Sequence, residues 1–357
     1  MEEKNQGKVN EVFKCPTCGA NLKYDIEKQG MTCEFCGTVI NVAGEVSHEE
    51  KDLDFSVIDD KSRWTNEVRL SHCQNCGAEI EVDTNLLSSN CPFCNTPLVV
   101  NEDVIKGLKP DRVIPFKVSE KNADEYYRKW LKKKFFAAIS VKKKIPNPSY
   151  FSTYIPSWTY DSNVNCTYKG RLGEHYQVKV GSGKNAHYET RTRWFLVSGS
   201  YSMFADDVLV CSGKSLNQEE LQKMEPFNTN DSVVFDNHFL AGHSTEHYSL
   251  SVKDGWTTAK SRIMARLRSN ILAKYDYDEI DYLNIFPVYD DVKYKYVTLP
   301  IWLCHYTFKK NKYKFLVNGE SGKITGNYPK SPVVISLVAL LIIAVVAVIL
   351  YLYFTSR

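Results

Sequence analysis

Eight of the eleven cysteines in this 357-residue chain lie in two windows that share one spacing. Each window reads Cys-x2-Cys, then fourteen residues, then Cys-x2-Cys. The candidate ligands are Cys15, Cys18, Cys33 and Cys36 in the first window and Cys73, Cys76, Cys91 and Cys94 in the second. Because two residues between cysteines allow one tight turn to direct both sulfurs at one ion, this spacing is typical of four-thiolate zinc sites. We expect two structural Zn²⁺ ions, and the alternative is two disulfides in each window.

The two windows form an internal repeat. Residues 15–42 and 73–100 align without a gap and share ten identities, among them the four cysteines and the pair Phe35 and Phe93. A residue that tolerates positive φ follows the second cysteine of each pair, as a tight knuckle often requires. These residues are Gly19, Gly37, Gly77 and Asn95. The repeat therefore predicts two zinc ribbons, and a four-cysteine site leaves no open position for substrate, so its zinc is structural.

The C-terminal residues predict a membrane anchor. Residues 333–354 carry no charge, and as a helix they would be about 33 Å long, enough for the ~30 Å hydrocarbon core. Lysines are frequent before the span and one arginine follows it, so the positive-inside bias places the preceding chain in the cytoplasm. The lysines are Lys309, Lys310, Lys312, Lys314, Lys323 and Lys330, and the arginine is Arg357.

We therefore expect a single-pass cell-membrane protein with a tail anchor and a cytoplasmic N-terminus. The chain opens MEEKNQGKVN, which has no apolar stretch, and we expect no signal sequence. The three cysteines outside the windows, Cys166, Cys211 and Cys304, are predicted to be buried and unpaired. Thiolate ligands and free thiols both indicate a reducing compartment.

The net charge of +3 conceals a strong polarity along the chain. Residues 1–100 carry 9 Lys and Arg against 17 Asp and Glu, a net charge of −8, and the remainder is basic. No Lys or Arg occurs from residue 71 to residue 100. Since nucleic-acid binding requires phosphate neutralisation, this acidic end favours a protein partner over DNA or RNA.

The fold class predicted is α+β, with two zinc ribbons, a strand-rich body and one C-terminal transmembrane helix. The expected division is ribbon 1 in 1–45, an acidic linker in 46–70, ribbon 2 in 71–108, a cytoplasmic domain in 109–328 and the anchor in 329–357. Apolar periodicity predicts helices over 119–138, 217–225 and 256–276, the first capped by Ser119. A β-meander is expected over 164–211, with glycine-rich turns at 170–173 and 181–183, and strands over 292–327.

A basic segment interleaved with aromatic residues suits an anionic membrane surface. It has no acidic residue from 128 to 144. The membrane-surface residues expected here are Arg128, Lys129, Trp130, Lys132, Lys133, Lys134, Lys142, Lys143 and Lys144. The alternative is a solvated helix face whose aromatic residues belong to the core.

The remaining candidates for chemistry are weak. His238, His243 and His247 lie close together, but no zincin-like carboxylate accompanies them, and core or surface histidines are the favoured interpretation. The segments YIPSWTY and TLPIWLCHY each place a Pro two residues before a Trp, which suggests either a paired aromatic pocket or two equivalent core strands. No nucleophile–base motif stands out, so we do not expect an enzyme.

These features resemble a family of bacterial membrane proteins labelled TFIIB-type zinc-ribbon proteins. The matching stretches are the ribbon windows, VIPFKVSEKNADEYYRKWLKKKFF, YIPSWTYD, TRWFLVSGSYSMFADDVLV, LAGHSTEHY and LPIWLCHYTFKKNKYKFLVNGESGKITG, which cover most of residues 70–330. Members of similar organisation are associated with phage-shock-type and SPFH-type membrane proteins. The resemblance implies a membrane-scaffold or envelope-stress role and brings no catalytic residues.

Three functions are compatible with the sequence. The favoured one is a membrane-anchored adaptor that recruits a protein partner at the cytoplasmic membrane surface through its zinc ribbons, in envelope stress or membrane organisation. The first alternative is a membrane-tethered nucleic-acid-binding protein of replication or transcription, which the acidic ribbon end disfavours. The second is an enzyme whose site is built from distant residues of the aromatic body.

Overall fold

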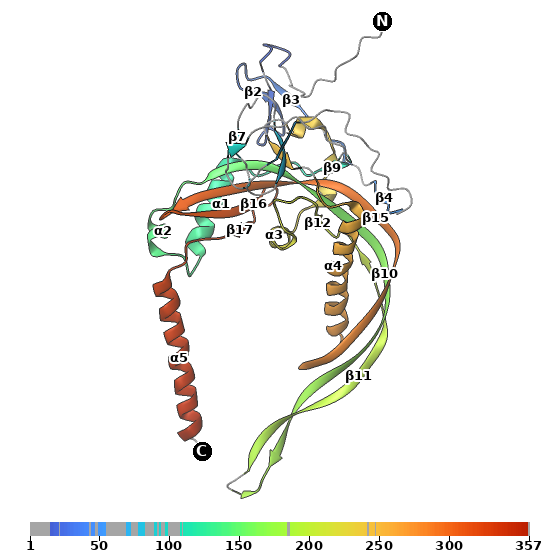
Figure 1. Cartoon of the computed structure of the whole chain (residues 1–357), viewed down its shortest axis with the longest axis vertical. Coiled ribbons are helices and arrows are strands. Elements are labelled where there is room, and N and C mark those ends of the chain that lie inside the picture. The colour runs from blue at the N-terminus through green and yellow to red at the C-terminus, as the bar shows by residue number, and fades with distance from the viewer. Residues whose placement is uncertain are drawn as a thin grey trace.

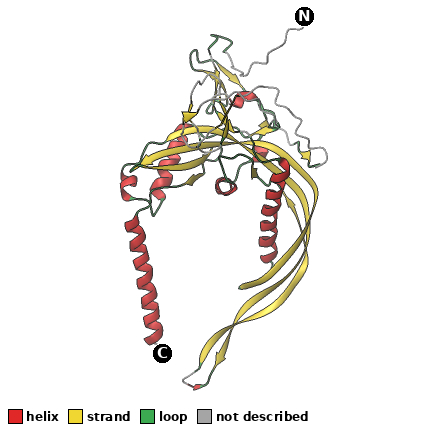
Figure 2. Cartoon of the chain, viewed as in Figure 1, coloured by secondary structure: helices red, strands yellow, loops and turns green. Residues whose placement is uncertain are grey.

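The computed structural model describes residues 15–20, 22–42, 44–46, 49–54, 69–72, 78–82, 89–90, 93, 97–98, 108, 110–183, 186–240, 243–246 and 248–355. The helices are α1 (Glu120–Lys133), α2 (Ile139–Lys143), α3 (Gln218–Met224), α4 (Val252–Leu272) and α5 (Pro332–Thr355), with 3-10 turns at Thr229–Asp231 and Asn237–Leu240. The N-terminal strands are β1 (Leu22–Asp25), β2 (Gly30–Cys33), β3 (Val39–Asn41), β4 (Lys51–Asp52), β5 (Arg69–His72), β6 (Glu79–Val82), β7 (Ser89–Asn90) and β8 (Pro97–Leu98). The strands of the body are β9 (Arg112–Val113), β10 (Ser149–Val180), β11 (His187–Ala205), β12 (Val210–Cys211), β13 (Val233–Val234), β14 (Ser244–Glu246), β15 (Glu279–Phe308), β16 (Asn311–Asn318) and β17 (Ile324–Gly326). Figure 2 shows a strand-rich α+β body with one long C-terminal helix.

Two very long strands organise the body. β10 and β15 pair antiparallel from Ser149 opposite His305 to Gly173 opposite Glu279. Figure 1 shows them bending together into an arch, with α4 inside the curve. We call residues 149–161 and 293–308 the proximal half of this arch, and residues 162–180 and 279–292 the distal half. β16 extends the proximal half beside β15, and β11 extends the distal half beside β10.

The proximal half is covered on both faces. Residues 153–161 and 296–304 are buried without interruption. Successive side chains of a strand point to opposite faces, so Trp302 packs with α1 and the first ribbon while Leu303 packs in the cluster that contains α3. Burial on both faces explains why these strands read as near-continuous apolar runs.

Among the residues that the structure describes, only α4 covers the distal half, and it does so on one face. From Asn163 to Gly170 exposed and buried residues alternate strictly. The buried set, which includes Val164 and Tyr168, packs against Ile263 and Leu267 of α4. The opposite face leaves large apolar side chains exposed to solvent; these are Leu196, Phe204, Phe286 and Val288.

The three predicted helices are confirmed, but one predicted turn is wrong. Ser119 caps α1, accepting a hydrogen bond from the Asn122 backbone, and Ala123, Tyr127 and Leu131 face the core. The glycines at 170 and 173 form no turn, because they lie inside β10. A Cβ on Gly170 would approach Leu283 Cδ1 to 2.9 Å, so glycine is required for packing there and not for a turn.

The two Pro-Trp segments are paired core strands. Ser152 lies opposite Trp302 and Trp158 opposite Tyr296 in the β10–β15 ladder. The indole N–H of Trp158 donates to the Leu250 carbonyl, whereas that of Trp302 donates to the Val118 carbonyl, both at 2.9 Å. Since the two rings belong to different hydrophobic clusters, they do not line a common pocket.

α5 leaves the body next to the segment between α1 and α2. The Ser331 backbone N–H donates to the Phe136 carbonyl at 2.8 Å, and Ala138 N–H donates to the Pro329 carbonyl at 2.9 Å. α5 has 24 residues, none of them buried within the described structure, and is long and apolar enough to cross a membrane.

Candidate metal centre and ribbon surface

Four thiols converge at the end of the first ribbon. Cys15 and Cys36 lie 3.5 Å apart, as do Cys18 and Cys33, measured between sulfurs, and all four are free of disulfide bonds. The disulfide alternative does not apply to this window, because its four cysteines are free. The predicted knuckle geometry is confirmed here, because Gly19 and Gly37 have φ of 74° and 77°. Each knuckle closes with the same bond, from Gly19 N–H to the Cys15 carbonyl and from Gly37 N–H to the Cys33 carbonyl, both 2.9 Å.

This group of cysteines could hold a metal ion, since its four sulfurs all lie within 4.8 Å of one another. Burial raises the pKa of Cys15, but backbone N–H groups of Cys18 and Thr17, with Cys36 and Thr38, outweigh it and lower that pKa to about 6. At Cys18 the Ala20 N–H lowers the pKa, but Cys36, burial, Cys33 and Cys15 raise it to about 12. Without a cation, the four sulfurs cannot all be thiolates at once, and a divalent ion removes that conflict.

The second set of predicted ligands, Cys73, Cys76, Cys91 and Cys94, lies outside the described residues, as do Gly77 and Asn95. The described parts of that window join the body. β6 pairs with β14, so the window's first hairpin extends the main sheet. Ala78 and Phe93 are buried in the same cluster as Ile114 and Leu209.

The first ribbon is docked firmly onto the proximal half of the arch. Met31 is fully buried, the Tyr24 ring lies 5.3 Å from the Phe239 ring, and the Gln29 amide donates to the Phe116 carbonyl at 2.8 Å. The ribbon sheet β1–β2–β3 thus shares one hydrophobic core with the body. Packing of this kind fixes the orientation of the metal group relative to the arch.

His243 lies in this docking interface. Its ring stacks on Phe116 at 4.8 Å and meets the edge of Tyr154 at 5.6 Å, and neither ring nitrogen has a hydrogen-bond partner. Burial lowers the pKa of His243 to about 4, so the ring is neutral at pH 7. His238 instead contacts Asp236 on the surface, and His247 lies outside the described residues. Among the described residues, only the cysteines form a metal-ligating group.

The repeat places one phenylalanine in two opposite environments. Phe35, between Cys33 and Cys36, is 86% exposed, whereas its counterpart Phe93 is 5% exposed. Val39 and Ile40 of β3 are also exposed beside this knuckle. We call the exposed turn that carries Phe35 the knuckle patch. Sequence identity at this position predicted the repeat but not this difference, which depends on how each phenylalanine packs against the rest of the chain.

The basic segment divides into two parts. Arg128 donates to Asp124 at 2.6 Å and to Asn147 at 2.9 Å, and Lys129 approaches Glu125 at 3.9 Å. Trp130 packs 5.8 Å from Tyr328, with the Lys134 ammonium 4.9 Å from the Trp130 ring centre. Arg128, Lys129, Trp130 and Lys134 are thus engaged in contacts within the protein. The other members make no ion pair among the described residues; they are Lys132, Lys133, Lys142, Lys143 and Lys144.

One cluster of charges was not anticipated from the sequence. Lys295 lies 3.1 Å from Glu50 and 2.9 Å from Asp207, and the Asp207 N–H donates to Asp161 at 2.5 Å. Burial, followed by a hydrogen bond with Glu50, raises the pKa of Asp161 to about 8. Glu50 comes from the predicted linker, whose residues Lys51 and Asp52 form β4 on the edge of β15. No local pattern links these four residues, which meet only through the long-range pairing of the strands.

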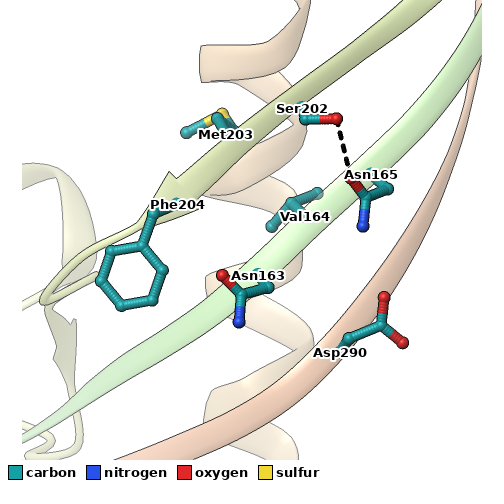
Figure 3. A pocket seen from close by; sticks show the side chains of 7 residues that line it. All are labelled: Asn163, Val164, Asn165, Ser202, Met203, Phe204 and Asp290. Atoms are coloured by element: carbon teal, nitrogen blue, oxygen red, sulfur yellow. Dashed lines mark hydrogen bonds between the residues drawn. The ribbon is translucent and has the colours of Figure 1, made fainter.

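The exposed face of the distal half has a shallow hollow. Its lining includes Asn163, Asn165, Phe204 and Asp290, and the Ser202 hydroxyl donates to Asn165 at 2.7 Å (Figure 3). The hollow is open, and its polar groups come from alternate positions of an ordinary sheet face. It has none of the buried, convergent polar groups that a small-molecule site requires.

The chain is similar to uncharacterized protein YdjG of Bacillus subtilis (strain 168), with 25% identity over 321 residues. The alignment covers 89% of this chain and 90% of that protein, so the likeness extends far beyond the cysteine windows. No protein-family model matches the chain, and no solved structure matches it.

Proposed function

We propose that this chain is a membrane-anchored adaptor that binds a protein partner through the knuckle patch of the first ribbon. The observation that carries the proposal is the contrast between Phe35 and Phe93. A phenylalanine that is 86% exposed on a docked, ordered element is a ready anchor for binding. The ribbon packs on the body through Met31, Tyr24 and Gln29 and leaves this side chain exposed.

The surroundings of Phe93 indicate what kind of pocket a partner would provide for Phe35. Phe93 is buried in a cluster with Leu209, Leu216 and Ile114 of the same chain. Because the two knuckles are repeats, Phe35 suits a similar aliphatic pocket on another protein. The resemblance described above suggests phage-shock-type or SPFH-type membrane scaffolds as the source of that pocket, in envelope stress or membrane organisation.

Zinc is the ion proposed for the cysteine group. A tetrahedral ion about 2.3 Å from each sulfur separates the sulfurs by about 3.8 Å, close to the 3.5 Å found here. With four protein ligands the ion has no position left for water, so its role is to hold the turn that carries Phe35. A second zinc in the second window is proposed from spacing alone. Purified in reduced form, the chain should contain about two zinc ions, and Cys33→Ser about one. A content near zero would contradict the metal assignment.

α5 is proposed to anchor the chain in the cell membrane, with the ribbons in the cytoplasm. Lysines before α5 and the free thiols support this orientation. The full chain should remain in the membrane pellet after alkaline carbonate, and deletion of 333–357 should release it. Quantitative retention of the truncated chain at high salt would show that α5 is not the main anchor.

The adaptor proposal is tested by cross-linking and capture from native membranes. Phe35→Ser should lower partner recovery at least about tenfold, because a central aromatic anchor contributes 2 kcal/mol or more. Tyr188→Ser is the matched control, since Tyr188 is 67% exposed on the distal hairpin. Equal recovery by both variants would reject the knuckle patch. Capture that nuclease abolishes, or that falls steeply with salt, would instead indicate the nucleic-acid alternative.

A further inference from the structure

Three apolar side chains are exposed beside the point where α5 begins. Phe135 and Ile139 are 68% and 61% exposed, and Phe136 is 36% exposed. They lie between the end of α1 and the first turn of α2, in a sequence otherwise dominated by lysine. The Phe135 and Phe136 rings are 5.1 Å apart and perpendicular, so they form one small apolar surface.

The backbone ties this surface to the start of the anchor. Ala137 and Lys330 form an antiparallel bridge, flanked by the bonds from Ser331 N–H to the Phe136 carbonyl and from Ala138 N–H to the Pro329 carbonyl. Strands paired in this way lie about 5 Å apart. Ser331 also caps α5, because its hydroxyl accepts a hydrogen bond from the Val334 N–H at 3.3 Å. Residues 135–139 are therefore at the level where α5 would enter hydrocarbon.

Charge surrounds the apolar surface on both sides. Lys132 and Lys133 precede it, Lys142, Lys143 and Lys144 follow it, and Lys330 is exposed in the adjoining segment. None of these six makes an ion pair with another described residue. Exposed aromatic and aliphatic residues bordered by unpaired lysines are the pattern of interfacial membrane contact, in which apolar groups enter the acyl boundary and cations meet anionic headgroups.

We propose that Phe135, Phe136 and Ile139 insert at the lipid–water interface next to α5, while the neighbouring lysines bind anionic headgroups. This second contact would fix the orientation of the arch relative to the bilayer, which a single helix alone does not fix. The proposal rests on the proposed anchoring by α5. It differs from the sequence expectation, because Trp130, Arg128 and Lys129 are engaged within the protein and Ile139 was not anticipated.

Photo-cross-linking of the full chain tests this contact. Benzoylphenylalanine would replace Phe135, Ile139, Tyr188 or Leu340, one at a time, in protein reconstituted into vesicles of phosphatidylcholine and phosphatidylglycerol. Each of these side chains is exposed, so the replacement should not disturb folding. We expect lipid adducts at 135, 139 and 340 and none at 188. Changing Lys132, Lys133, Lys142, Lys143 and Lys144 together to Gln should lower the adduct yield at 135 several-fold, and so should pure phosphatidylcholine.

The outcomes separate the two proposals. Lipid adducts at 340 without adducts at 135 and 139 would overturn the interfacial contact and leave the anchor intact. No adduct at 340 would refute membrane insertion of α5 itself. Adducts at 135 to a protein, in native membranes, would identify this surface as a partner-binding site and would also overturn the lipid assignment.

Discussion

The two halves of the arch are built from the same pair of strands but in different surroundings. In the proximal half, ribbon 1 and α1 cover one face and α3 lies in the cluster on the other, so nine consecutive residues of β10, 153–161, are buried. In the distal half, α4 covers one face and the other is open. Both candidate functional surfaces adjoin the covered half: the knuckle patch belongs to the ribbon docked on it, and the other surface lies beside the start of α5.

This difference has energetic consequences. The proximal half adjoins buried charges, which are stable only while their ion-pair partners are present, and a buried histidine, which is stable only while it is neutral. In the distal half one face of the sheet is in contact with water, so substitutions on that face are tolerated. Substitutions should therefore have large effects in the first region and small effects on the open face of the second.

The largest effect is expected at Lys295. Lys295→Met leaves Glu50 and Asp207 without their cation, and should lower the free energy of unfolding by about 3–5 kcal/mol. The measurement is urea unfolding followed by tryptophan fluorescence. Lys169→Met, on the exposed face of the distal half, is the control and should change stability by less than about 0.5 kcal/mol.

Asp161→Asn checks that charge, not volume, is responsible. Because burial keeps Asp161 largely protonated below pH 8, an amide of the same shape should be tolerated far better than Lys295→Met at pH 7. Equal losses of unfolding free energy in Lys295→Met and Lys169→Met would show that the ion pairs of Lys295 do not stabilise the folded chain.

The next effect is a pH dependence from His243. Its pKa is about 4 in the folded chain against an ordinary value of 6.5, so the unfolded state binds more protons between these values. Stability should be unaffected above pH 6.5, fall as pH decreases toward 4, and reach a total loss of about 3 kcal/mol. The signal to follow is protection of ribbon 1 amides in hydrogen exchange.

His243→Phe is the matched variant, because it retains the ring contact with Phe116 and removes the titrating group. Its ribbon should show a shallower loss of protection between pH 6.5 and 4 than the parent chain. Parallel acid profiles in the two proteins would exclude His243 as the cause.

The same comparison shows what a single sequence can reveal. The strands of the distal half and the amphipathic helices were predictable from the sequence. Each has one face in water and one in the core, so its apolar residues recur at a regular interval. The knuckles were predictable because metal ligation fixes spacing. The turn predicted at Gly170 was wrong. The sequence around a glycine that is required because Leu283 packs against it does not differ from that around a glycine in a turn. Exposure of Phe35, burial of Phe93 and the Lys295 cluster depend on long-range docking, for which the sequence has no local sign.

A moderate effect is expected where α4 approaches the sheet. A Cβ on Gly255 would lie 2.3 Å from Tyr160 Oη and 2.9 Å from Trp158, and both side chains are fully buried. Gly255→Ala should therefore cost about 1–3 kcal/mol, despite the better helix propensity of alanine. Ser269→Ala, exposed on the same helix, supplies the propensity control and should be neutral or slightly stabilising. Stabilisation by both variants would mean that α4 lies farther from the sheet.

The smallest effect is expected on the open face of the distal half. Phe286 is 57% exposed and lies opposite Thr167 in the ladder, with α4 on the other side of the sheet. Phe286→Thr places a β-branched residue with high strand propensity at this position and should alter stability by no more than about 0.5 kcal/mol. Leu283→Thr, on the face that packs against α4, should cost more than about 2 kcal/mol, because Leu283 is 8% exposed. Urea unfolding of the full chain in detergent compares the two. Similar costs would show that something covers the outer face in the folded protein, and a cost at Phe286 that grows with protein concentration would identify that cover as a second copy of the chain.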